Sequence, residues 1–299
     1  MAERLPYDPR QMLRSQRLPR PTKTAWPPAW SKVSFWLFLG GWLAASGLVA
    51  LGFQTPERWR WMELIFPWLA ALAALGALAQ RVPTQNAVGV GFIVLVLTSG
   101  VVACDVTTGI PFGVIHYTER AEPLLFDRFP VWVPFWWVAI LVSSRETARL
   151  ILQPRRHHRA YGLWILGGAA LLAVLTDLSW ESYGVRVRSL WLWHTSERMV
   201  CWYSAPWVNF LGWAVVALVT LGFAMPWFIN KHPRPAAPRL APALVWALIN
   251  LHYTIGNATR GLWLAAGVGL AAVGLVFGFA WHGAKHPAPL PVAPLPMKA

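Results

Sequence analysis

The sequence predicts an all-α fold, a polytopic transmembrane helical bundle of seven or eight spans. Of the 299 residues, 56% are hydrophobic and only 13% are charged, and 21 are tryptophan, a composition that soluble domains do not have. Residues 33–53 form a run of about 20 residues without a charge, enough to cross about 30 Å of hydrocarbon at 1.5 Å per residue. The remaining apolar runs are separated by arginine, proline or acidic clusters, which is typical of successive membrane spans.

Eight segments are candidate spans: residues 33–53, 62–79, 87–104, 131–152, 162–178, 205–229, 240–255 and 262–282. The segment 240–255 is the least secure, because it is short and contains Asn250 and His252. It could be a short span, a re-entrant piece or an interfacial helix. This pattern divides the chain into a basic cytoplasmic tail (1–32), a transmembrane helical domain (33–283) and a Pro-rich C-terminal tail (284–299).

The basic residues predict how the bundle is oriented. If all eight segments cross, 18 of the 26 Lys and Arg residues lie on the side of both termini. The positive-inside rule then places both termini of this multi-pass protein in the cytoplasm, and we expect its membrane to be the bacterial plasma membrane. The loops after the third and fifth spans share the outer face. We expect the net charge of +14 to face lipid headgroups and not nucleic acid, and the first span to act as an uncleaved signal anchor.

Acidic residues are scarce, with four Asp and eight Glu in the chain, so those near the hydrocarbon are candidates for function. Asp105 ends the third candidate span. Asp177 and Glu181 end the fifth, and their i, i+4 spacing puts both carboxyls on one helical face if the helix continues. Two close carboxylates in a dry place resist double ionisation, so the pair would provide an acid and a base near neutral pH. Alternatively, these acids mark helix ends and pair with arginines of the following loop.

Aromatic residues crowd around the acidic pair: Trp180, Tyr183, Trp191, Trp193, Trp202, Tyr203 and Trp207. An interfacial aromatic belt explains part of this density. A pocket lined by rings, for a long conjugated ligand or a transient carbocation, would explain the rest, since each desolvated face is worth up to about 2 kcal/mol to a cation. At the other end of the fourth span, Glu146 and Arg149 are spaced for a helix-end ion pair.

The sequence lacks the residues that several classes of enzyme need. The histidines are too few and too scattered for a di-iron site, the four aspartates form no Asp-rich magnesium motif, and no Gly-rich nucleotide loop occurs. The two cysteines cannot build a disulfide framework or a four-ligand metal site, and we expect both to be small buried residues. The sequence therefore predicts no metal and no cofactor. What remains is proton chemistry on an apolar substrate, or no chemistry.

At these residues the sequence resembles the membrane carotenoid 1,2-hydratases of the CruF and bisanhydrobacterioruberin hydratase type. Residues 108–126 (TGIPFGVIHYTERAEPLLF), followed by VWVPFWW, are similar to the family's TGxPFGxYxY segment and the aromatic helix after it. DLSWES, WLW and WYSAPWVNFLGW, within residues 177–213, are similar to its DLxxDP, WxW and YYGVPxxNFxGW motifs. The chain departs from the pattern at Val102, where the family usually has Glu, and at Ser182, which replaces the Pro.

The resemblance implies an acid-catalysed hydratase that adds water across the terminal 1,2 double bond of an acyclic carotenoid end group. Protonation of carbon 2 leaves a tertiary cation at carbon 1, and water adds there without a redox cofactor. The acids Asp105, Asp177 and Glu181 are the catalytic candidates, and their roles stay open. The resemblance implies these residues as substrate contacts or holders of water: Thr108, Tyr117, Trp180, Trp191, Trp193, Trp202, Tyr203 and Asn209.

Two other functions fit the same residues. A carotenoid cyclase would use the same cation to close a ring, and its product would have an unchanged mass. A non-catalytic carotenoid- or lipid-binding membrane protein would need no acid at all. In each case we expect a hydrophobic carotenoid and membrane lipid as partners, together with other enzymes of carotenoid biosynthesis.

Overall fold

The computed structural model describes residues 28–53, 56, 61–196, 198–229 and 239–287, without the side chains of 61–64. Most of both predicted tails, residues 1–27 and 288–299, lies outside the described residues, while residues 29–32 already belong to the first helix. Each of the eight predicted apolar segments forms a helix: α2 (Ala29–Ala50), α3 (Trp61–Ala79), α4 (Thr84–Thr108), α5 (Val133–Ile151), α6 (Tyr161–Ser182), α7 (Trp207–Phe228), α8 (Ala241–Thr259) and α9 (Trp263–Lys285).

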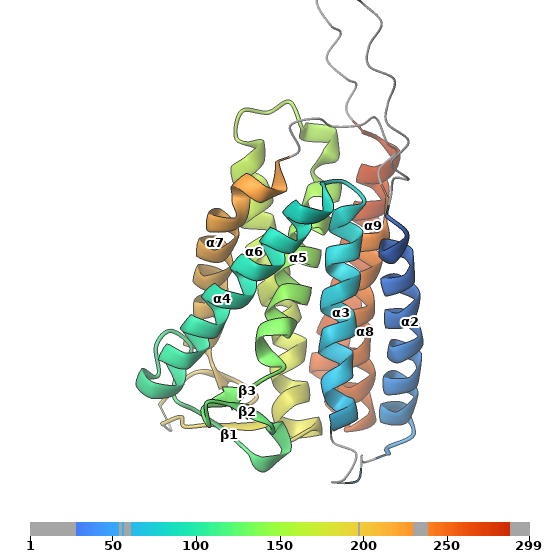
Figure 1. Cartoon of the computed structure of the whole chain (residues 1–299). Coiled ribbons are helices and arrows are strands. Elements are labelled where there is room, and N and C mark those ends of the chain that lie inside the picture. Colours follow the sequence, from blue (N-terminus) through green and yellow to red (C-terminus); the bar gives the residue numbers. More distant parts are fainter. Residues whose placement is uncertain (1–27, 54–55, 57–60, 197, 230–238, 288–299) are drawn as a thin grey trace, which may run out of the picture.

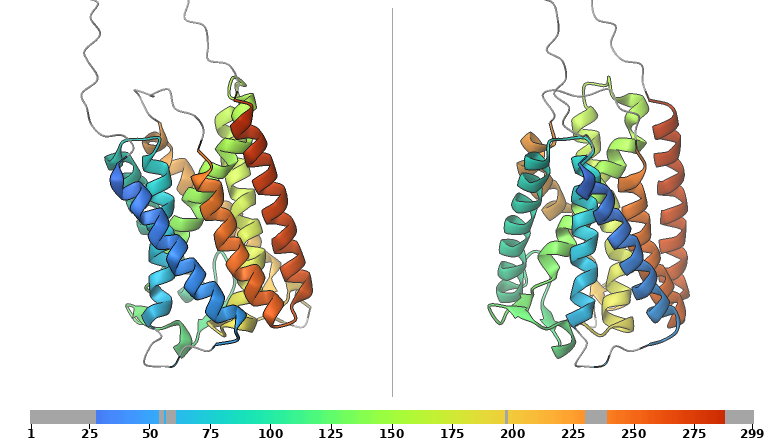
Figure 2. Two further views of the ribbon diagram at one scale, coloured as in Figure 1. Left: turned by 90° about the vertical axis from the view of Figure 1, so that its right-hand side faces the viewer. Right: turned by 45° about the vertical axis from the view of Figure 1, so that its right-hand side comes forward.

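Five of the described helices, α2, α4, α6, α7 and α9, are long and apolar enough to cross a membrane by length and composition. The helices stand side by side in one bundle, with both ends of the described chain at the same end of it (Figure 1 and Figure 2). Helix α5 packs against α3, α4, α6, α8 and α9, and nearly all of its residues are buried. The chain is therefore an all-α membrane bundle built around α5.

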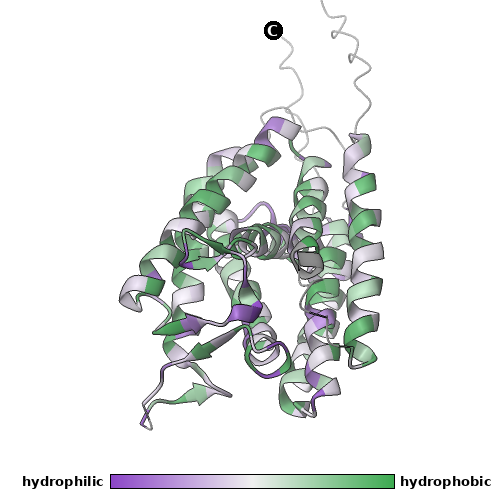
Figure 3. Ribbon diagram, turned by 60° about the horizontal axis from the view of Figure 1, so that its bottom comes forward, coloured by the Kyte–Doolittle hydropathy of each residue, from purple (hydrophilic) through white to green (hydrophobic). Residues whose placement is uncertain are grey.

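Short strands and turns close the opposite end of the bundle. β1 (Ile115–Tyr117) pairs antiparallel with β4 (Trp191–Trp193), β2 (Leu124–Leu125) with β3 (Phe129–Pro130), and β5 (Cys201–Trp202) with β6 (Ala205–Pro206). Single turns lie at this end at Glu119–Ala121 and, as a π-helix, at Tyr183–Val187, while the turn at Gln153–Arg155 follows α5 at the other end. The β1–β4 pairing joins the loops after α4 and α6, which the sequence places on one face. Hydrophilic residues gather in the loops and strands of this end, while the helices are mostly hydrophobic (Figure 3).

Helix α6 is longer than predicted. The apolar run ends at residue 178, but the helix continues through Ser182 into the π turn, so Asp177 and Glu181 lie one above the other inside a helix. Likewise, α4 continues to Thr108, beyond Asp105. The acids are buried and hydrogen-bonded there, so tertiary contacts let the helices extend past the apolar runs.

Helix α8, the least secure segment, lies within the bundle against α2, α5 and α9. Its Asn250 Nδ2 donates to Thr176 Oγ1 at 3.2 Å, and Asn257 Nδ2 donates to the Ser179 carbonyl at 3.0 Å, both on α6. The indole N–H of Trp42 on α2 donates to the Leu248 carbonyl at 2.6 Å. The polar residues that shorten the apolar run are thus interhelical contacts, and α8 is not a helix lying on the surface of the bundle.

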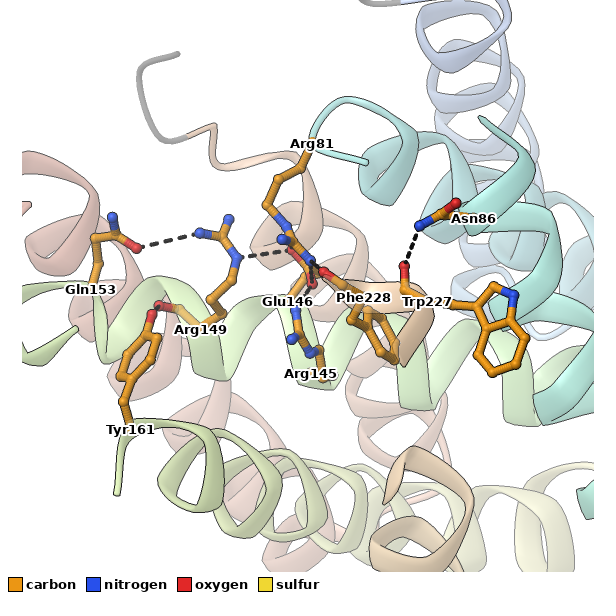
Figure 4. A network of polar contacts seen from close by, with 9 residues as sticks. All are labelled: Arg81, Asn86, Arg145, Glu146, Arg149, Gln153, Tyr161, Trp227 and Phe228. Carbon is orange, nitrogen blue, oxygen red and sulfur yellow. Dashed lines mark hydrogen bonds and ion pairs between the residues drawn. The ribbon is translucent and has the colours of Figure 1, made fainter. Parts of the chain in front are cut away.

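Glu146 of α5 is the centre of a buried ionic cluster at the end away from the strands (Figure 4). It pairs with Arg81 at 2.9 Å, with Arg145, and with Arg149 at 3.0 Å, which confirms the predicted i, i+3 pair. The Arg145 guanidinium also lies 4.1 Å from the ring centroid of Phe228 on α7. The cluster joins α3, α5 and α7. Contrary to the sequence expectation, Cys104 is exposed and Cys201 half-buried.

Candidate active site

Two carboxyls of α6 share one amide of α7. Asp177 and Glu181 are buried, with 0% and 4% exposure. The Asn209 Nδ2 group donates to Asp177 Oδ2 at 2.7 Å and to Glu181 Oε1 at 3.2 Å. Asn209 lies in the first turn of α7, where the sequence enters the helix after Pro206. The i, i+4 spacing therefore brings the acids together, and a side chain about 30 residues away bridges them.

The second oxygen of Glu181 accepts two indole N–H groups. Trp191 donates to Glu181 Oε2 at 3.1 Å and Trp193 donates to it at 2.8 Å. Both rings come from β4 and are set by its pairing with β1. A Cβ atom at Gly184 would overlap the Trp191 ring, so only glycine in the π turn lets this ring reach the acid. Glu181 thus receives three N–H donors, which favour its charged form.

The third acid, Asp105, approaches from α4. It is 2% exposed, and its Oδ1 accepts the Phe112 backbone N–H at 2.8 Å. Between the two residues the chain turns back at Gly109, which has a φ of 73°. A Cβ atom at Gly212 of α7 would collide with the Phe112 ring and the Pro111 carbonyl, so this turn packs closely on α7. The turn therefore holds Asp105 between α4 and α7.

Asp105, Glu181 and Asn209 line one narrow cavity, which we call the acid cavity; Asp177 lies behind Asn209 and does not line it. Its volume is about 50 Å³, which is room for a few water molecules. Tyr117 also lines it, and burial, together with the charges of Asp105 and Glu181, raises the pKa of its phenol above the ordinary value. Tyr117 is therefore a neutral donor beside both acids.

Among the substrate-binding candidates, Tyr117, Trp180, Trp191, Trp193 and Asn209 line the acid cavity. Three others lie outside it. Thr108 is exposed and its hydroxyl donates to the Cys104 carbonyl at the end of α4. The indole N–H of Trp202 donates to the Leu178 carbonyl at 2.8 Å, and the Tyr203 hydroxyl accepts the Ala265 N–H at 3.2 Å. These three have structural partners, and we assign them no role at the site.

The cavity has aromatic walls that the sequence reasoning missed: Phe112, Trp132, Trp136, Trp137 and Trp213. Trp137 and Trp213 are stacked, with ring centroids 3.8 Å apart. The segment VWVPFWW indicated a helix that begins with aromatic residues. Only the packing of that helix shows that its rings face the acids. Among the described residues, no group of three or more His, Cys, Asp and Glu side chains is placed to hold a metal ion.

The fold and the cavity define a polytopic helical membrane protein with buried acids inside a wall of aromatic rings. Residues 60–276 match the family model of the carotenoid biosynthesis proteins. This match covers well over half of the chain, so the chain belongs to that family and has a role in carotenoid biosynthesis. Neither the curated proteins nor the solved structures compared with the chain gave a significant match.

Proposed function

We propose that the protein is a carotenoid 1,2-hydratase, which adds water across the terminal double bond of an acyclic carotenoid end group. One observation carries the proposal: carboxyls from two separate helices, Asp105 of α4 and Glu181 of α6, line the same aromatic-walled cavity. Hydration of an alkene needs a proton on one carbon and water on the next. The site therefore needs two acids with different roles, one that donates the proton and one that orients the water. The family match supports the carotenoid as the substrate class.

The hydrogen bonds favour different roles for the acids. Glu181 accepts three N–H donors, each of which favours its charged form, so we assign it as the base that orients the attacking water. The side chain of Asp105 accepts the Phe112 N–H at one oxygen, and we assign it the transferable proton. Asp177 has a buried Oδ1 without a hydrogen-bond partner and contacts the cavity only through Asn209. We therefore assign Asp177 as a positioning residue.

In the proposed reaction, Asp105 transfers its proton to carbon 2, and the π electrons of the double bond form the new C–H bond. The tertiary cation left at carbon 1 lies among indole faces and near the Glu181 carboxylate, which lower its energy. Water adds to carbon 1 and gives a proton to Glu181. That proton returns to Asp105 through water or the Tyr117 hydroxyl, and the product is a tertiary alcohol one water heavier than the substrate.

The first test is expression with lycopene as substrate, with and without oxygen. We expect a product one water heavier under both conditions. Asp105→Asn and Glu181→Gln should each lower hydration by about 10²–10⁴-fold, the usual contribution of a general acid or base, while the folded protein remains in the membrane. A product of unchanged mass but altered absorbance would identify a cyclase, and pigments unaffected by both substitutions would identify a binding protein.

Deuterated water separates the two roles. Glu181→Gln should still allow protonation, so the recovered substrate should gain deuterium when the cation loses a proton instead of capturing water. Asp105→Asn should show neither hydration nor exchange. If Asp105→Asn allowed deuterium exchange and Glu181→Gln did not, the roles of the two acids would be exchanged and the hydratase proposal would stand.

A further inference from the structure

A second and larger cavity lies beside the acid cavity, and we call it the long cavity. It has a volume of about 410 Å³ and is bordered by α2, α3, the start of α5 and the ends of α6 and α8. Trp132, Trp136 and Trp180 line both cavities. These three indoles therefore form a wall that the two spaces share.

The long cavity is built to hold an apolar chain. Helix α2 lines it from Gly41 to Val49 with small or aliphatic side chains, a path of about 12 Å at 1.5 Å per residue, and Phe53 beyond the helix continues the lining. On the facing side, the Tyr183 hydroxyl and the His252 ring are hydrogen-bonded to each other at 3.0 Å. The other His252 nitrogen is bonded to Ser46 at 3.0 Å. These polar groups form hydrogen bonds with one another, so the surface that they leave for a ligand in the long cavity is mainly hydrocarbon.

The volumes of the two cavities suit different parts of one substrate molecule. About 50 Å³ in the acid cavity is enough for water and the tip of a chain, but not for a conjugated chain of carotenoid length. The rest of the molecule must leave that cavity, and the long cavity is the adjoining space of suitable size and polarity. Its charged groups, including Arg120 and Glu122, come from the strand-bearing end, so a chain inserted from that end passes into apolar surroundings.

We propose that the long cavity binds the polyene chain of the substrate, and that the end group reaches the acids between the rings of Trp132 and Trp180. These rings meet edge to face, with centroids 5.8 Å apart and planes at 89°. Trp136 meets Trp180 at the same centroid distance and 69°. Turning one ring would open the passage and would leave the remaining rings against the cation. That the bound ligand is the polyene of a carotenoid rests on the proposed hydratase function.

The test fills the long cavity without touching the acids. Ala45 lies on its α2 wall, and Ala45→Trp places an indole in the space assigned to the polyene. We expect lycopene hydration to fall at least about tenfold, the effect of losing about 1.4 kcal/mol of binding. Hydration of geranylacetone, a short isoprenoid with the same dimethyl-substituted end, should change less than about twofold. The matched control Ala271→Trp lies on an exposed position of α9, and we expect it to alter neither rate.

A binding measurement makes this test independent of catalysis. The pigment that copurifies with the detergent-solubilised protein is measured by its absorbance relative to protein. We expect Ala45→Trp and Leu48→Trp each to lose at least about fivefold of this pigment, because both residues line the long cavity. Equal pigment in these variants and in Ala271→Trp would overturn the inference. Pigment lost as expected, but without hydration by the native protein, would overturn the proposed function and keep the polyene site.

Should Ala45→Trp not fold, Leu48→Trp replaces it, since Leu48 is already large and 42% exposed. A rate for geranylacetone that falls in parallel with that for lycopene would contradict the inference, because the short substrate does not need the long cavity.

Discussion

The two ends of the bundle each bury carboxyls, but the hydrogen-bond donors around these carboxyls are charged at one end and neutral at the other. At the end away from the strands, Glu146 is surrounded by Arg81, Arg145 and Arg149 (Figure 4). At the strand-bearing end, Asp177 and Glu181 are held by the neutral N–H groups of an amide and two indoles. No Lys or Arg side chain lines the acid cavity among the described residues.

The difference separates a carboxylate held by ion pairs from those that we propose to be reactive. Three guanidinium groups hold Glu146 permanently charged, so it cannot donate a proton at ordinary pH, and its cluster joins three helices. Neutral donors orient the acids of the acid cavity without supplying a counter-charge, and in our proposal Asp105 keeps the transferable proton there. Burial alone therefore does not indicate catalysis; the charges of the partners decide.

We expect the largest difference in stability when the same Glu-to-Gln substitution is made at each end of the bundle. Glu146→Gln leaves three arginines without their anion, and we expect a loss of about 3–5 kcal/mol in the free energy of unfolding. Glu181→Gln keeps a neutral acceptor for the indoles, and the loss should be below about 1 kcal/mol. Thermal unfolding in detergent measures both, with Asp127→Asn on the exposed loop as the control. Equal losses at the two sites would remove the distinction between the clusters.

A smaller effect is expected at the close contact between Gly184 and Trp191. Gly184→Ala adds a methyl group that overlaps the indole and displaces its N–H from Glu181. We expect a loss of about 1–3 kcal/mol in stability together with slower hydration. Gly267→Ala is the matched control, because nothing lies within 4 Å of its added Cβ atom in α9. If both substitutions were neutral, the π turn would not be needed to place the indole.

The smallest effect sharpens the role of the neutral donors. Trp193→Phe removes one N–H from Glu181 while keeping an aromatic face in the cavity. Loss of a hydrogen bond to a charged group should slow hydration about tenfold, with little change in unfolding temperature. The control is Trp263→Phe, at a ring that is 72% exposed. A rate that did not fall would show that the indole donors contribute nothing to the charge state of Glu181.

The sequence predicted the helices because uncharged runs of suitable length allow few other structures. All eight predicted segments are helices, and the spacing of Asp177 and Glu181 correctly predicted one shared face. The ends were less accurate, since the apolar run stops at residue 178 while the helix continues to Ser182. Helix ends depend on local capping and on packing, which hydropathy does not record.

The candidate site was only partly predictable. Sequence reasoning identified the acids and the aromatic motif around β4, because carboxyls beside apolar runs are costly without a function or a partner. It could not find the indoles of Trp132 and Trp136, because the start of α5 is aromatic on several faces and only its neighbours determine which face points to the acids. It also included Thr108, Trp202 and Tyr203, whose nearness in sequence to the acids does not put them in the acid cavity.

The sequence alone determined a helical membrane bundle with a few acids at one end, since the cost of placing charge and unpaired backbone in hydrocarbon depends on local composition. Only the tertiary structure decided which of these acids meet and what neutralises them. Asn209 and β1 come from distant parts of the chain, and the contacts that they and the Gly184 turn make form only when the helices pack. Composition is local, whereas contacts between acids and their donors depend on distances across the fold.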